Sequence, residues 1–310
     1  MKSEKIKNRC VIAFSCGFDS IAILLDMLNG MWDMPLVECP ELVLSHVISS
    51  NIPSTQFQLL SFAKIGYALD NEGINPLRNT IQITTSSVCI SDCNLLTGFL
   101  DDLNLSDKLQ YNYRLATTFH PTGLSAISTH AMAAIACVDC SYDNIEIFYG
   151  FNAGDDLTLY QNDVRTAILA QSKILTLRSD TNVTVNYPLS SHTKSDVIQF
   201  IYELIMNASL SNKKSFQVLA QLILHHVTFC EYVYQGHKSD TSCIEREYDL
   251  NKDYGAFDIH RVCTSCKDVL VALHELYRNG KDDIVVYMVS ILYTNHRLQN
   301  YVLGVIHHTL

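Results

Sequence analysis

Strand-like and helical patterns alternate along the first two-thirds of the chain, and this alternation limits the possible folds more than any other feature. Short runs rich in β-branched residues are followed by runs with apolar residues at helical spacing. Strands that alternate with helices in this way form a parallel sheet covered by helices on both faces. The sequence therefore predicts an α/β protein with a parallel five-stranded sheet, its strands expected at 9–15, 41–50, 79–87, 144–152 and 183–191.

The last third of the chain has a different pattern, because helical runs follow one another there without strand-like segments between them. In the first two-thirds, helices are expected at 19–30, 55–70, 124–138 and 194–206. Beyond them, helical runs cover 215–235, 266–280 and 282–306, with a polar stretch between the first two. We therefore predict an α/β domain over 1–208 and a helical C-terminal region over 209–310.

The acidic balance of the chain limits its partners. The formal net charge is −10, and general nucleic-acid binding needs a basic face, so we expect no direct contact with nucleic acid. No apolar run reaches the ~18 residues of a membrane span, and the N-terminus lacks the cleavage-like end of a signal peptide. The eleven cysteines suggest buried thiols in a reducing compartment. We expect a cytoplasmic protein without membrane association.

The stretch SCGFDS, residues 15–20, joins the first expected strand to the first expected helix. Backbone N–H groups at the start of a helix point at an anion, and the helix dipole favours negative charge there. Ser15 and Ser20 add hydroxyl donors, and Gly17 lets the backbone turn tightly. The alternative is an ordinary connection in which Asp19 or Ser20 caps the helix. The residues of this turn leave both interpretations open.

A second candidate site is a group of soft metal ligands in the last third. His260, Cys263 and Cys266 are spaced three apart, and Cys243 precedes them across a polar loop. Three thiolates and one imidazole suit tetrahedral Zn²⁺, which would fix a loop with little core of its own. The alternative is a chance pair of cysteines that faces the core. Cys230 and His237 are reserve ligands.

The loop at 15–20 resembles the Ser-Gly-Gly-x-Asp-Ser/Thr loop of the ATP pyrophosphatases, or PP-loop enzymes, which hold the pyrophosphate part of ATP on it. Walker-type and dinucleotide glycine motifs are both missing. Within that class the chain resembles the 7-cyano-7-deazaguanine synthase (QueC) family, whose catalytic domain ends in a zinc knuckle. That knuckle has a Cys, a loop, then Cys-x-x-Cys-x-x-Cys, and here His260 replaces one Cys. The resemblance covers roughly 10–270 and implies a Rossmann-like fold of the adenine nucleotide α-hydrolase type.

Two further segments carry the resemblance. GFNAGDDLTLYQND, after the fourth expected strand, resembles the substrate loop of the QueC family. YPLSSHTKSDVI resembles the segment in which a Lys opens a helix and contacts ATP phosphate, a role that falls on Lys194. The substrate contacts are expected in the first segment, where Phe151 or Tyr160 stacks on the ring and Asp155 or Asp156 reads its edge. The alternative is a solvated loop for Asp155 and Asp156, and a surface lysine at a helix start for Lys194.

The chain also departs from the family pattern. Cys16 replaces the central Gly of the loop, where its side chain can still point away from the nucleotide. The segment FHPTGLS aligns with Phe-x-Pro-Gly-Arg-Asn of the family, but its Arg and Asn are missing. The helical C-terminus after the knuckle is an addition to a plain synthase. These departures indicate a divergent member.

The resemblance implies an ATP-dependent ligase. The carboxylate of 7-carboxy-7-deazaguanine attacks the α-phosphate of ATP, ammonia converts the acyl-adenylate to an amide, and a second adenylation gives the nitrile. The cofactors implied are ATP, Mg²⁺ and Zn²⁺. Lys194 and Asp19 receive the catalytic roles, and ATP binding is assigned to Ser15, Cys16, Gly17, Phe18, Asp19, Ser20, His46 and Lys194.

The resemblance implies two kinds of partner. QueC-like proteins also occur in antiphage operons, including CBASS-type systems, where the activated carboxylate is thought to pass to an amine of a partner protein. That role is weighed equally with plain nucleobase synthesis, and the family analogy implies a homodimer. One alternative is a catalytically inactive nucleotide-binding scaffold. A third, tRNA thiolation, conflicts with the acidic charge.

Overall fold

The computed structural model describes residues 8–49, 55–88, 142–153, 181–211, 213–229, 242–251 and 257–308, together with residues 169, 172, 173 and 176. Within these residues, five strands form one parallel sheet in the order β3-β2-β1-β4-β5. Their bounds are Asn8–Ala13 for β1, Glu41–Ser49 for β2, Ile81–Val88 for β3, Asn144–Phe148 for β4 and Asn182–Asn186 for β5. The predicted α/β class and five-stranded parallel sheet are confirmed, and the architecture is Rossmann-like.

The strand order reverses beside β1. The chain runs outward from β1 through β2 to β3, then returns to place β4 on the other side of β1. In open parallel sheets, ligands bind outside the carboxyl ends of the strands at such a switch point. The segments that leave β1 and β4 are therefore the first place to look for a functional site.

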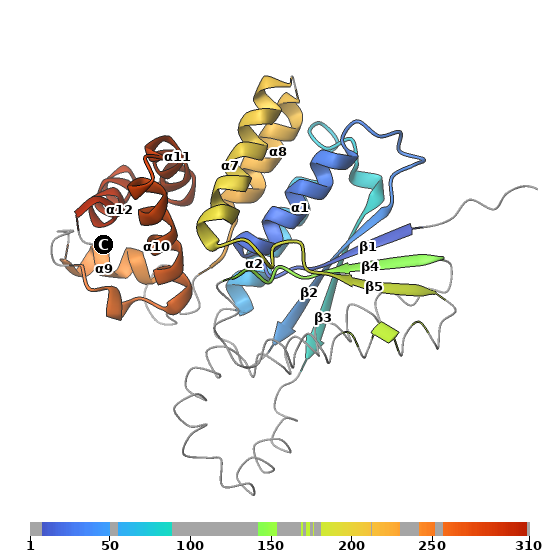
Figure 1. Ribbon diagram of the computed structural model, residues 1–310, viewed down its shortest axis with the longest axis horizontal. Helices are drawn as coiled ribbons and strands as arrows, with labels where there is room; N and C mark the ends of the chain where they lie inside the picture. The colour runs from blue at the N-terminus through green and yellow to red at the C-terminus, as the bar shows by residue number, and fades with distance from the viewer. Residues whose placement is uncertain are drawn as a thin grey trace, which may run out of the picture.

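One face of the sheet is covered by a layer of helices, which Figure 1 shows above the strands. This layer contains α1 (Phe18–Met31), α2 (Thr55–Leu69), α7 (Lys194–Leu210) and α8 (Lys214–His225). On this face the strands bury Ile12, Leu42 and Leu44 in one large core cluster. The opposite face buries a separate cluster that includes Val11, Val43 and Ile147. The helix expected over 124–138 lies outside the described residues.

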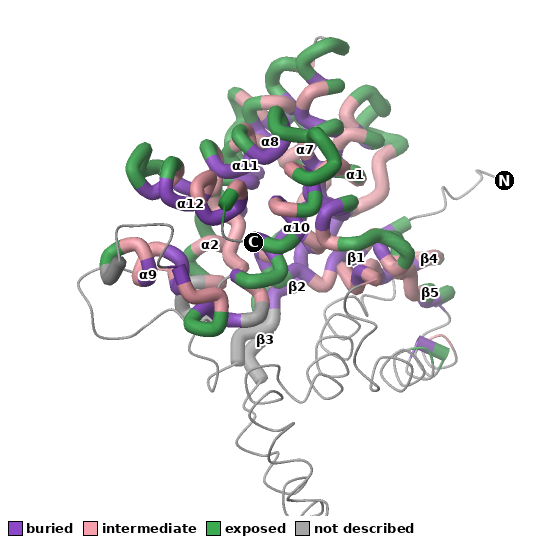
Figure 2. Tube along the Cα trace, turned by 60° about the vertical axis from the view of Figure 1, so that its left-hand side comes forward, coloured by how far each residue is buried: buried purple, intermediate pink, exposed green. Residues whose placement is uncertain are grey.

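The remaining helices follow the polar stretch of the last third. They are α9 (Cys243–Asn251), α10 (Thr264–Arg278), α11 (Asp282–Leu292) and α12 (His296–His308), and α10 packs against α7. Short 3₁₀ turns lie at Arg78–Thr80 and Ile259–Arg261. The buried stretches of α8, α10 and α11 in Figure 2 belong to the same core cluster as α1. The core is therefore continuous across the boundary placed between 208 and 209.

Two helix predictions were wrong in extent. In the run at 215–235, which the structure describes as far as 229, the helix extends from Lys214 to His225. The chain then leaves it, and Thr228 donates its N–H to the Cys16 carbonyl at 2.8 Å. The run at 282–306 is two helices, since Tyr293 is extended and Asn295 caps a new helix. Within the described residues, no helix is long and apolar enough to cross a membrane.

Candidate functional site

Residues 15–20 form a compact turn at the N-terminus of α1. The hydroxyl of Ser20 donates to the Gly17 carbonyl at 3.0 Å, and the Ser15 and Ser20 hydroxyl oxygens lie 3.3 Å apart. Gly17 occupies the N-cap position, and no side chain caps the first amides of α1. Ser15 is exposed. The turn therefore presents a hydroxyl and uncapped backbone N–H groups, the donors that an anion uses at a helix start.

Cys16 has a left-handed backbone, with φ of 63°. Its side chain is fully buried and its thiol donates to the Gln58 carbonyl at 3.6 Å, so it points away from the exposed side of the turn. Burial raises the pKa of the Cys16 thiol and keeps it protonated. Phe18 is also buried and packs on Phe229, with ring centroids 5.6 Å apart. These two predicted ATP-binding residues can therefore contribute backbone groups but not side chains.

Asp19 lies where three segments meet. Its carboxylate forms an ion pair with Lys194 at the start of α7, and the other carboxylate oxygen accepts from Asn152 Nδ2 at 3.2 Å. A Cβ on Gly150 would lie 2.9 Å from that of Asp19, so only glycine allows β4 this close to α1. The carboxyl ends of β1, β4 and β5 thus bring together two of the predicted residues, Asp19 and Lys194.

His46 lies under the turn. Its ring is buried and stacks on Phe62, with centroids 4.8 Å apart, and its Nδ1–H donates to the Phe14 carbonyl at 2.8 Å. Burial lowers the pKa of His46, against the opposing effect of that hydrogen bond. The structure therefore places this predicted ATP ligand where it supports the end of β1 and has no exposed surface for a nucleotide.

The predicted substrate residues are only partly covered by the structure. Phe151 lies parallel to Tyr149 at a centroid distance of 5.7 Å and contacts Tyr187 at 5.8 Å. It belongs to the cluster on the sheet face opposite α1. Asp155, Asp156 and Tyr160 lie outside the described residues. Phe151 therefore packs with aromatic neighbours near the switch point, and the rest of the predicted substrate loop has no described geometry.

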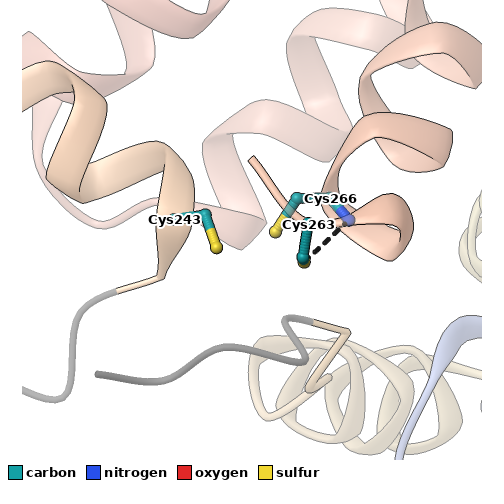
Figure 3. A group of neighbouring side chains, drawn as sticks. All are labelled: Cys243, Cys263 and Cys266. Carbon is teal, nitrogen blue, oxygen red and sulfur yellow. Dashed lines mark hydrogen bonds between the residues drawn. The ribbon is translucent and has the colours of Figure 1, made fainter. Parts of the chain in front are cut away.

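The thiols of Cys243, Cys263 and Cys266 form a buried group that can hold a metal ion. Cys243 begins α9, Cys263 is the N-cap of α10, and Cys266 lies in its first turn (Figure 3). The three sulfur atoms lie within 4.8 Å of one another. The Cys266 N–H donates to the Cys263 sulfur at 3.4 Å, and the α10 dipole favours negative charge there. Three thiolates suit soft metal ions such as Zn²⁺.

His260, the predicted fourth ligand, is not part of this thiol group. It is exposed on the 3₁₀ turn Ile259–Arg261, where its backbone N–H donates to Asp258 Oδ1 at 2.9 Å. The Asp258 side chain fixes this turn, and His260 therefore follows the turn and not the helix start that carries Cys263. The described residues supply three ligands. The reserve residues Cys230 and His237 lie outside them.

Four residues around Asp19 and Lys194 could not be recognised in the sequence. Asn152 follows β4, and its place at the switch point was the available signal. Ser195 follows Lys194 and binds Glu275 of α10. Asp268, also on α10, is near enough to Lys194 and Asp19 for their charges to act on its carboxyl. Neither α10 residue stands in a sequence pattern that connects it with the turn.

No protein-family model, no curated protein and no solved structure matches the chain.

Proposed function

We propose that the protein binds ATP on the turn at 15–20 and transfers AMP to a carboxylate. The observation that carries this proposal is the ion pair between Lys194 and Asp19, which brings a lysine from beyond β5 to a turn after β1. A lysine, a hydroxyl and uncapped helix-start amides beside one another are the groups that stabilise a leaving pyrophosphate. The resemblance to PP-loop enzymes assigns Lys194 the same role.

The adenylation step needs few protein groups. An oxygen of the substrate carboxylate attacks the α-phosphorus, the bond to the bridging α,β-oxygen breaks, and pyrophosphate leaves with the electron pair. Lys194 would leave Asp19 and contact the phosphates, while Asp19 would be free to ligate the Mg²⁺ that accompanies ATP. The turn amides and Ser15 would hold the leaving group.

The proposed substrate is 7-carboxy-7-deazaguanine, by resemblance to the QueC family. Phe151, Asp155, Asp156 and Tyr160 are the proposed contacts. An amine then attacks the acyl carbon and AMP leaves. The amine is ammonia, followed by a second adenylation that gives the nitrile, or it belongs to a partner protein in antiphage defence. We further propose that the thiol group holds structural Zn²⁺, and that the protein is a cytoplasmic homodimer.

Pyrophosphate release from ATP tests the proposal. With the carboxylate substrate and an amine present, Lys194→Ala should lower the rate by about 100-fold or more, as loss of a transition-state contact does. Lys213→Ala is the matched control, because Lys213 also stands at a helix start and pairs with an aspartate, Asp33, at 2.7 Å. It should leave the rate unchanged.

Two outcomes would overturn the enzyme proposal. One is wild-type protein that releases no pyrophosphate with the carboxylate and either amine. The other is a Lys194→Ala variant that releases pyrophosphate at the same rate as Lys213→Ala. ATP binding without any pyrophosphate release would favour the inactive scaffold.

A further inference from the structure

The first turn of α7 carries Lys194 and is fixed by a cluster of polar side chains. Thr193 and Asp196 form a capping box, in which each side chain binds the backbone N–H of the other. Ser195 is buried, its oxygen lies 3.1 Å from that of Thr193, and its hydroxyl donates to Glu275 Oε2 at 2.6 Å. Glu275 belongs to α10, so the turn is held from outside its own helix.

α10 turns one face toward this part of α7. Asp268 and Glu275 are seven residues apart, or about two turns, and therefore lie on one side of the helix. Ala272, between them on that side, is buried. On that side, Glu275 accepts the Ser195 hydroxyl hydrogen bond at 2.6 Å. Figure 1 shows the two helices side by side.

The position of Glu275 is unfavourable for α10 by itself. It lies in the last turn, where the partial charge of the helix terminus is negative and a carboxylate is repelled. The same carboxylate lies at the N-terminus of α7, where the partial charge is positive and attracts it. The carboxylate of Glu275 therefore stabilises the first turn of α7, which is the turn that holds Lys194 against Asp19.

The geometry points to Glu275 as a positioning residue for Lys194, acting through the Ser195 hydroxyl. Through this bond α10, the helix that begins at the thiol group, helps to position the lysine proposed to contact phosphate. Its importance for catalysis rests on the proposed function, but the placement of Lys194 can be measured without it.

Labelling of Lys194 with an amine-reactive reagent, read by peptide mass spectrometry, measures that placement. The Lys194 side chain is only 23% exposed and Asp19 holds its amine, so this placement limits the access of the reagent. Glu275→Ala should raise its labelling rate by about fivefold, the equivalent of one hydrogen bond. Glu275→Gln keeps an acceptor for Ser195 but loses the charge, so its labelling rate should lie closer to the wild-type rate than that of Glu275→Ala does. Glu203→Ala is the matched control, since Glu203 is an exposed residue of α7 that binds Gln199.

Ser195→Ala is the second variant, because it removes one oxygen and leaves both helices otherwise intact. It should raise Lys194 labelling as Glu275→Ala does, and the double variant should raise it no further, since both changes break one bond. Labelling in Ser195→Ala and Glu275→Ala that equals labelling in Glu203→Ala would overturn the inference. So would a Glu275→Gln variant that behaves like Glu275→Ala.

Pyrophosphate release separates this inference from the proposed function. If both hold, Glu275→Ala lowers kcat by about fivefold with less change in KM, and Glu275→Gln restores part of this loss. Increased labelling without pyrophosphate release from any variant leaves the placement intact and rejects the enzyme. Release that depends on Lys194, with labelling and kcat unaffected by Glu275→Ala, rejects the inference alone.

Discussion

Cys16 occupies a backbone conformation that favours glycine. Its φ of 63° is a left-handed conformation, which a side chain disfavours by about 1–2 kcal/mol and glycine does not. The thiol compensates in part, because it is buried and donates to the carbonyl of Gln58 on α2. The Cys16 side chain therefore contributes to the packing under the turn and not to its exposed side.

Two substitutions at Cys16 should separate backbone strain from packing. Both Cys16→Ala and Cys16→Gly remove the buried sulfur, but only glycine relieves the left-handed backbone. We expect Cys16→Gly to be more stable than Cys16→Ala by about 1 kcal/mol in the free energy of urea unfolding. At most positions alanine is more stable than glycine. A Cys16→Ala variant that is more stable than Cys16→Gly would therefore exclude backbone strain at this residue.

His46 should make stability depend on pH. Burial lowers the pKa of His46 in the folded protein. Below about pH 6.5, His46 is therefore protonated in the unfolded chain more readily than in the folded protein. The free energy of unfolding should therefore fall as the pH drops from about 7 to 5. His46→Asn keeps a donor for the Phe14 carbonyl but does not titrate, and should reduce this loss in urea unfolding. Identical pH profiles would contradict the assignment.

At the scale of elements, the break between α11 and α12 depends on one side chain. Asn295 Oδ1 accepts from the N–H of Arg297 at 2.9 Å, which caps α12. Asn295→Ala should lower the free energy of unfolding by about 1 kcal/mol, whereas Asn295→Asp keeps the acceptor and should differ by only a few tenths. Urea unfolding of both variants tests this. Equal destabilisation of the two would show that the cap does not set the break.

The elements that could be predicted from sequence are those that local patterns determine. All five strands are present within the described residues, because β-branching and burial on both faces mark a parallel strand locally. The end of α8 could not be found this way, since it depends on Thr228 reaching Cys16. The break at Asn295 had a local signal, a preferred N-cap residue, but the apolar period continued through it.

In the candidate site, too, residues within local motifs could be predicted and residues joined by distant contacts could not. Asp19 and Lys194 were predicted from motifs that surround each of them. Asn152 was not, because its partner Asp19 is 133 positions away, and Ser195 and Glu275 are 80 positions apart. His260 has the right spacing to Cys263 but lies on a separately capped turn, outside the thiol group. The spacing of residues in the sequence identifies candidate ligands, whereas contacts between distant segments can be found only once the fold is known.

At the scale of the whole molecule, the thiol group connects the C-terminal helices. Cys243 belongs to α9, and Cys263 and Cys266 belong to the start of α10. α9 has nine residues and is too short to persist alone. Its other contacts include Tyr248, whose ring meets that of Tyr301 on α12 at 5.3 Å. A metal ion on the three sulfurs would therefore hold α9 in place.

Metal removal should loosen α9 before the sheet. Binding to the folded state at 100 times Kd adds about 2.7 kcal/mol of stability, so a chelator should lower the thermal midpoint. Hydrogen exchange should rise first in α9, while β1 and β2 stay protected. Cys263→Ser should abolish the bound metal measured by elemental analysis. Cys39→Ser, at a half-buried cysteine outside the group, should retain it. Less than about half an equivalent of metal in the wild type, or exchange that rises equally in sheet and helix, would contradict a metal-held α9.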